Sequence, residues 1–121
     1  MDVVTGTELR DRTKRYSTAI VKFARTLPSD TVTAVLVRQL VKSGTGVGAN
    51  YRSACRAKSK RDFISKLAFV EEEADESQFW LELLVESGIA PADSVKWLVN
   101  EAEQLVRISV ASINTARGGH R

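Results

Sequence analysis

The sequence predicts an all-α protein folded as an antiparallel up-and-down four-helix bundle. Four segments of about 18 to 29 residues repeat their apolar side chains at helical spacing. The connections between them are only a few residues long, which favours antiparallel neighbours. Hydrophobic residues make up 43% of the 121 residues and charged residues 27%, as in an ordinary globular domain. We therefore expect a single domain over residues 1–121.

The first helix is predicted from about Thr7 to Leu27. Apolar residues recur along it with helical spacing, at Leu9, Tyr16, Ile20, Phe23 and Leu27. Pro28 stops this pattern, and Ser29 with Asp30 offers a new N-cap. The sequence thus places the first turn of the bundle at residues 28–30.

The second helix is predicted from between Ser29 and Thr31 to about Cys55. One face carries the residues expected to face the core: Val32, Val35, Leu36, Gln39, Leu40, Ser43 and Val47. Gly44, Gly46 and Gly48 interrupt it, and each glycine costs about 0.5 to 1 kcal/mol inside a helix. Because the pattern resumes beyond them at residues 50 and 54, we expect one unbroken helix.

The third helix has the clearest period in the chain. Ser59 and Asp62 resemble a capping box, and a heptad follows at Phe63, Leu67, Val70, Ala74, Ser77, Leu81 and Leu84. Ser87 and Gly88 are typical of a helix C-terminus. The heptad predicts a helix buried along one stripe.

Pro91 is predicted as a first-turn residue of the fourth helix, which runs to about Ala116. Its inward face follows the same four-three spacing, at Leu98, Ala102, Leu105, Ser109, Ser112 and Ala116. The tail that ends in Gly-Gly-His-Arg offers nothing to pack, so residues 116–121 are expected to fray.

The chain shows no apolar run of the roughly 18 to 20 residues that a membrane span needs, and no apolar signal segment at its start. Its single cysteine, Cys55, cannot close an intrachain disulfide. These observations predict a cytoplasmic protein. The net charge of +3 permits an acidic partner without requiring one.

Several motifs, taken together, resemble the bacterial four-helix bundle proteins known as 23S rRNA intervening sequence proteins or S23 proteins. The motifs are Gly44-Thr45-Gly46-Val47-Gly48-Ala49-Asn50-Tyr51-Arg52, Ala57-Lys58-Ser59, Asp62-Phe63, Lys66-Leu67, Glu73-Ala74-Asp75-Glu76 and Trp80-Leu81-Glu82-Leu83-Leu84. Leu27-Pro28 and Ile113-Asn114-Thr115-Ala116 extend the likeness over nearly the whole chain. Gly46 and Ser53 depart from the pattern, where a serine and a glutamate respectively are common.

The resemblance implies a ring-shaped homo-oligomer, a homopentamer, with no established catalytic activity. Some members of the family are encoded inside insertions of large ribosomal RNA genes, and the family is related to accessory proteins of diversity-generating retroelements. The resemblance therefore implies RNA or DNA binding.

Self-association is also predicted from the residues themselves. The second helix has a further apolar or small-residue face, and the third carries large apolar residues outside its heptad, where they mark a partner surface. The predicted subunit interface comprises Val37, Val41, Gly44, Gly48, Phe79 and Trp80. Alternatively, the broad apolar faces pack against two neighbours inside one bundle.

A row of bases is the best functional signal. Arg38, Lys42, Arg52 and Arg56 lie within about 80° of each other on the second helix, and Lys60 and Arg61 follow. Such a row suits sequence-independent contact with nucleic-acid phosphates. The alternatives are charge pairing between subunits and simple solvation of the surface.

No catalytic, metal or cofactor site is predicted. The glycines of residues 44–48 match no phosphate-binding motif, and the single histidine, His120, lies in the tail. Cys55 has no histidine to activate it and is expected to be packed. Residues 71–76 form an acidic face, in which Glu73 is expected to be half-buried and paired with an arginine of another helix.

The sequence thus predicts a protein that is not an enzyme, assembles with itself, and presents a basic surface to RNA, DNA or a nucleic-acid-bound protein. The alternative is a structural or protein-interaction module whose ring docks another protein.

Overall fold

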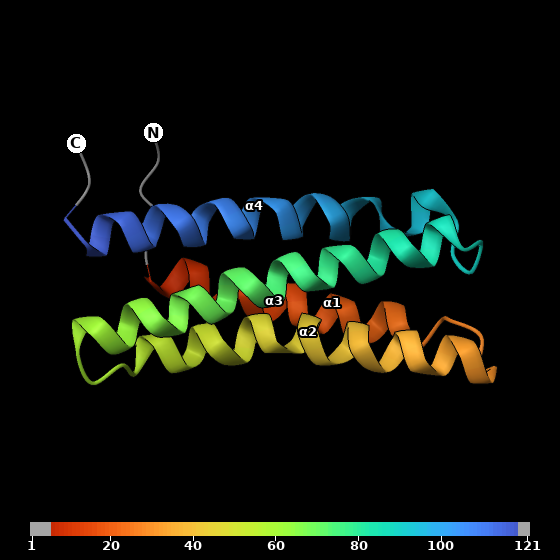
Figure 1. The fold of residues 1–121 in the computed structure, drawn as a ribbon, viewed down its shortest axis with the longest axis horizontal. Helices are drawn as coiled ribbons and strands as arrows, with labels where there is room; N and C mark the ends of the chain where they lie inside the picture. The colour runs from red at the N-terminus through yellow and green to blue at the C-terminus, as the bar shows by residue number, and fades with distance from the viewer. Residues whose placement is uncertain (1–5, 119–121) are drawn as a thin grey trace.

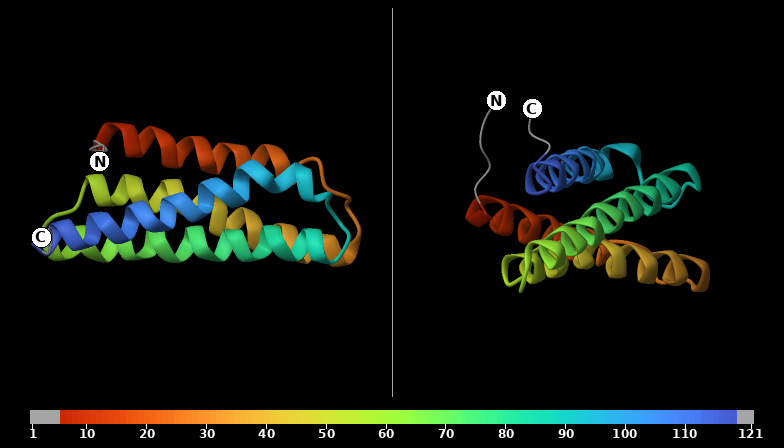
Figure 2. Two further views of the ribbon diagram at one scale, coloured as in Figure 1. Left: turned by 90° about the horizontal axis from the view of Figure 1, so that it is seen from above. Right: turned by 60° about the vertical axis from the view of Figure 1, so that its left-hand side comes forward.

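The computed structural model describes residues 6–118 and confirms the predicted fold over this range. Four antiparallel helices follow one another: α1 (Gly6–Ala24), α2 (Thr31–Cys55), α3 (Lys60–Glu86) and α4 (Ala92–Ala116) (Figure 1). Each helix packs against the next in sequence, and α1 also meets α4 over a shorter stretch (Figure 2). The backbones of the diagonal pairs, α1 with α3 and α2 with α4, do not approach closely, although the Tyr16 side chain of α1 reaches Ser77 of α3. Helices α2 and α3 therefore each have two neighbours.

Side-chain caps fix where α2 and α3 begin. The Asp30 carboxylate accepts a hydrogen bond from the Thr33 amide at 3.0 Å, and the Ser59 hydroxyl accepts one from the Asp62 amide at 3.0 Å. Gly88 follows the C-cap of α3 with φ of +80°, a conformation that favours glycine. Three of the predicted helix boundaries therefore have a local cause in the sequence.

Two predicted boundaries differ slightly from the structure. Helix α1 ends at Ala24, three residues before the expected Leu27, because residues 25–27 form a turn in which Thr26 bonds the Phe23 carbonyl. Pro91 is the N-cap of α4 rather than a residue of its first turn. Helix α4 ends at Ala116 as predicted. Residues 119–121, including His120, lie outside the described residues.

The core follows the predicted faces of α1, α3 and α4. All the heptad positions of α3 are buried except Phe63 at its N-terminal end, which is half-buried. Tyr16 of α1 is fully buried, and its hydroxyl lies 2.7 Å from the Ser77 hydroxyl of α3. That hydrogen bond satisfies two polar groups that would otherwise be costly to bury.

The prediction for the inward face of α2 is wrong at its start. Val32 is 67% exposed and Val35 is 50% exposed, whereas Leu40, Ser43 and Val47 are buried as expected. Consecutive residues of a helix point about 100° apart, so Val35 cannot share the direction of the neighbouring Leu36. Val32 lies in the first turn, at the end of the bundle.

The glycines of α2 allow its two neighbours to approach closely. A Cβ on Gly44 would come within 2.7 Å of Ile20, and one on Gly48 within 2.8 Å of the Ser17 hydroxyl, both on α1. A Cβ on Gly46 would instead meet the Glu73 carboxylate of α3 at 2.5 Å. Helix α2 is continuous through all three glycines, as predicted, because tertiary contacts outweigh their low helix propensity.

Candidate nucleic-acid interface

Six bases form the basic edge, which lies entirely on the outside of the molecule. They are Arg38, Lys42, Arg52, Arg56, Lys60 and Arg61. All six residues are exposed, and neither of the two ion pairs among residues 6–118 involves any of them. The four bases of α2 face away from its buried side. From Arg38 to Arg56 they extend over about 27 Å at the helical rise per residue. The structure thus leaves all six predicted residues accessible.

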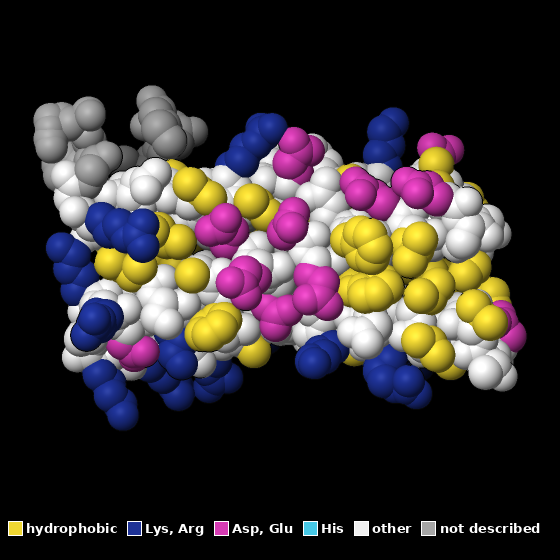
Figure 3. All heavy atoms as spheres, viewed as in Figure 1, with side chains coloured by type: hydrophobic (Ala, Val, Ile, Leu, Met, Phe, Trp, Pro, Cys, Tyr) yellow, Lys and Arg dark blue, Asp and Glu magenta, His cyan; other side chains and the backbone are white. Residues whose placement is uncertain are grey.

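The turn between α2 and α3 carries the basic edge round the end of the bundle. Lys60 and Arg61 open α3 directly after the Ser59 cap. Together with Ile64 and Arg117 they line a shallow hollow. Figure 3 shows Lys and Arg side chains gathered at this end of the molecule and along the outer side of α2. Arg117 joins Lys60 and Arg61 in the structure, although its position in the sequence did not indicate this.

Two further bases lie on α1 next to α2. Burial has the largest effect on the pKa of the Tyr51 hydroxyl of α2 and raises it. Arg10 is close enough for its positive charge to lower that pKa in part. The backbone of Lys14 approaches Gly48. Both side chains are exposed. Because Arg10 and Lys14 are four residues apart, the sequence places them on one side of a helix. It does not indicate which neighbouring helix that side adjoins.

The predicted subunit interface divides into two parts. Gly44 and Gly48 lie on the side of α2 that faces α1, and Gly44 is buried there by Ile20 of the same chain, whereas Val37 and Val41 are half-buried. The assignment of Gly44 to a subunit contact is therefore wrong, and Gly48 likewise packs against α1. The second apolar face of α2 serves a second neighbour inside the bundle, which was the alternative interpretation.

Phe79 and Trp80 remain available to a partner. Phe79 is 54% exposed and Trp80 half-buried, and their rings meet edge to face with centroids 4.9 Å apart. Figure 3 shows hydrophobic side chains gathered over the C-terminal half of α3 and the start of α2. Val32 and Val35 are among the exposed residues of α2 in this region. Phe79 and Trp80 are residues of the predicted interface that the single bundle covers only in part.

Comparison with known proteins identifies the family. The family of 23S rRNA-intervening sequence proteins matches the chain over residues 7–111, which is most of its length. The chain belongs to this family. A crystal structure of a protein of unknown function from the S23 ribosomal protein family of Bacteroides thetaiotaomicron is also similar, with a TM-score of 0.81 and 30% identity. The match covers 87% of this chain and 97% of that one. No curated protein matches the chain.

Gly46, one of the two departures noted in the sequence, packs closely against α3. The Glu73 side chain of α3 occupies the space that a side chain at position 46 would need. Partial burial raises the pKa of the Glu73 carboxyl, and the nearby charges of Glu76 and Glu72 raise it further, whereas Lys42 lowers it. Ser53, the other departure, is exposed and contributes to no such packing.

The predicted pairing of Glu73 with an arginine is wrong. The ion pair between helices joins Arg12 of α1 to Glu101 of α4, with the guanidinium donating to both carboxylate oxygens at 2.6 and 3.0 Å. Arg12 also donates to the Gln104 side chain at 2.8 Å. The hydrogen bonds to Glu101 hold the pKa of Arg12 above its ordinary value. Glu101 is 7% exposed, so this pair fixes the short contact between α1 and α4.

Cys55 is exposed at the end of α2, which corrects the prediction of a packed thiol. The end of the helix leaves its side uncovered, while Tyr51 one turn earlier is buried. Burial, with a smaller contribution from the Cys55 thiol, raises the pKa of Tyr51 to about 12.

Within residues 6–118, no group of three or more His, Cys, Asp or Glu side chains is placed to hold a metal ion. In the same range, no helix combines the length and the hydropathy of a membrane span.

Proposed function

We propose that this protein is a non-enzymatic, cytoplasmic homo-oligomer that binds RNA or DNA by phosphate contacts along the basic edge. The observation that supports the proposal is the row of six exposed bases, none of which takes part in an ion pair among the described residues. A duplex advances about 3.4 Å per base pair, so a row of about 27 Å would follow roughly eight base pairs. Repetition by the symmetry of an oligomer would multiply the contact.

The chemistry of the edge favours phosphates over bases. Between the cations, the outer side of α2 carries the small residues Thr45 and Ala49, which let a backbone approach the helix. Stacking platforms for unpaired bases need exposed aromatic rings, and Tyr51, the aromatic residue of α2, is buried. We therefore expect binding with little sequence preference.

The test compares two variants that remove equal charge. The first variant carries Ala in place of Arg38, Lys42, Arg52 and Arg56. The second carries Ala in place of Arg15, Lys22, Lys96 and Arg107. All eight side chains are exposed, so both proteins should fold. Affinity for a labelled 20-base-pair DNA and a 20-nucleotide RNA is measured by fluorescence anisotropy at low salt. We expect the first variant to bind at least tenfold more weakly and the second less than threefold. An equal loss in both variants would reject the basic edge as the site.

A second function, as a structural or protein-interaction module, is favoured by the exposed Phe79 and Trp80. A homopentamer is the assembly that family membership suggests. We expect the wild type to sediment as an oligomer and the Phe79→Glu variant as a smaller species, because a charge would be buried in the contact. Val110, 39% exposed on α4, provides the matched control Val110→Glu. A monomeric wild type would refute self-association.

A further inference from the structure

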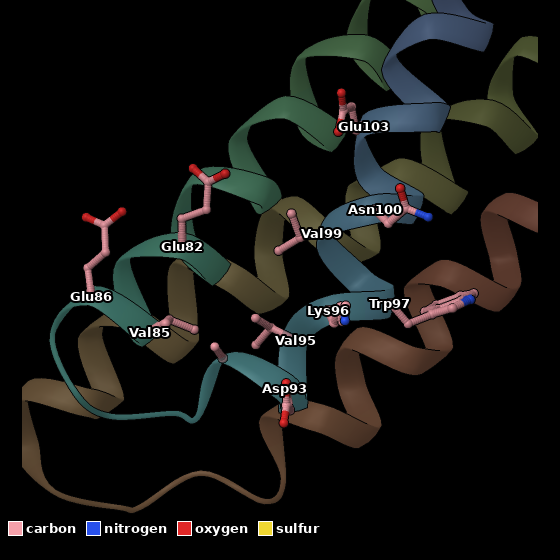
Figure 4. Close-up of a pocket in the computed structure, with 11 residues that line it drawn as sticks. Glu82, Val85, Glu86, Asp93, Val95, Lys96, Trp97, Val99, Asn100 and Glu103 are labelled. Atoms are coloured by element: carbon pink, nitrogen blue, oxygen red, sulfur yellow. The ribbon is translucent and has the colours of Figure 1, made fainter.

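An acidic groove lies between the end of α3 and the start of α4 (Figure 4). Its floor is apolar: Val85, Val95 and Val99 point into the space between the two helices. The charged residues that border it are Glu82, Glu86, Asp93, Glu103 and Lys96. The hollow measures about 830 Å³ and is open to solvent.

The carboxylates of the groove are largely available to a partner. Glu103 pairs with Arg107 one turn along α4. Glu82, Glu86 and Asp93 are exposed and take part in no ion pair within residues 6–118. The groove therefore combines an apolar floor with a net negative border. Nucleic acid is repelled by such a border, and a purely apolar ligand would gain nothing from it.

We propose that the groove binds a basic amphipathic helix of another protein. An apolar stripe at helical spacing would lie on the three valines, while lysines or arginines beside the stripe would meet the carboxylates. From Ala92 to Glu103, α4 extends about 17 Å, enough for three turns of such a helix. Helix-in-groove recognition uses this arrangement of anchors. This proposal does not depend on nucleic-acid binding, because α2, the helix with most of the basic edge, contributes no residue to the groove.

The probe is a synthetic 14-residue peptide of leucine and lysine, with the leucines spaced to form one stripe on a helix. Two control peptides are used, one with the same composition but scattered leucines and one with glutamate in place of lysine. Binding is followed by anisotropy of the labelled peptide at 150 mM salt. We expect the striped lysine peptide to bind at least tenfold more tightly than either control. Equal binding of the scattered peptide would overturn the proposal.

Charge-reversal variants locate the binding. The groove variant carries Glu82→Lys and Glu86→Lys, and the matched control carries Glu72→Lys and Asp75→Lys, on the same helix but outside the groove. All four side chains are exposed. We expect a loss of at least tenfold for the groove variant and less than threefold for the control. Equal losses would show general charge attraction and overturn the proposal.

Sedimentation of the two variants without peptide tests for a different occupant. We expect both to keep the assembly state of the wild type. If the groove variant alone dissociates, a second copy of the chain occupies the groove, and the proposal of a separate partner is wrong.

Discussion

At the scale of single residues, the contact between α1 and α2 depends on a side chain that reaches a glycine-containing backbone. The Ser17 hydroxyl donates to the Gly44 carbonyl at 2.8 Å and accepts from the Gly48 amide at 3.0 Å. Side chains at either glycine would block this approach, because Ile20 and Ser17 already occupy the space. The sequence analysis assigned both glycines to a contact with another subunit. Spacing alone does not tell which helix comes close.

Replacement of Gly44 by Ala should therefore destabilise the fold of the single chain. The added methyl group would overlap Ile20, and overpacking of this kind costs about 1 to 3 kcal/mol. Gly6→Ala is the matched control, since its Cβ would meet only the Tyr51 hydroxyl at 3.7 Å. Urea unfolding followed by circular dichroism measures both. Equal stability of Gly44→Ala and wild type would show that α1 and α2 are farther apart than described.

Glu73 should make stability depend on pH. Its folded-state pKa is raised, chiefly by burial, so the folded protein holds this proton more tightly than the unfolded chain. Stability from this residue is therefore lost as pH rises through the raised pKa. We expect Glu73→Gln to unfold at higher urea than wild type at pH 7, with the difference vanishing below about pH 4, where both states hold the proton. A difference independent of pH would contradict this explanation.

At the scale of helices, periodicity and caps account for most of what the sequence predicts. Ser59 and Asp62 predicted the start of α3 from the local sequence alone. The heptad from Leu67 to Leu84 correctly predicted its buried stripe. The pair of Arg12 with Glu101 was not predictable in this way, because 89 residues separate them. Their meeting depends on how α1 and α4 are placed, which no local pattern encodes.

The contact between α1 and α4 should depend on that ion pair. Arg12→Met leaves Glu101 almost buried without its partner, at a cost of about 1 to 3 kcal/mol. The double variant with Glu101→Leu should recover most of this loss, because two apolar side chains can replace a buried pair. A double-mutant cycle by urea unfolding measures the coupling. Additive effects would show that the pair contributes nothing specific.

At the scale of the whole molecule, charge separates two surfaces. The basic edge follows the outside of α2 and the turn into α3, whereas carboxylates gather over the middle of α3 and around the groove beside α4 (Figure 3). The four bases of α2 were predictable because helical spacing alone puts them on one side. Arg10, Lys14 and Arg117 were not, since they join the same region only through the packing of other helices. A nucleic acid and a basic protein segment would thus bind different sides of the bundle.

The salt dependence of DNA binding tests the central claim most directly. For duplex DNA the slope of log K against log salt is about −0.9 for each phosphate neutralised. We expect a slope of roughly −3.6 to −5.4 for the wild type, if four to six bases of the edge each contact a phosphate. The variant with Ala at Arg38, Lys42, Arg52 and Arg56 should lose most of that slope, and the control with four bases removed from α1 and α4 should keep it. A wild-type affinity that does not change with salt, or a slope unaltered by loss of these four side chains, would contradict the account.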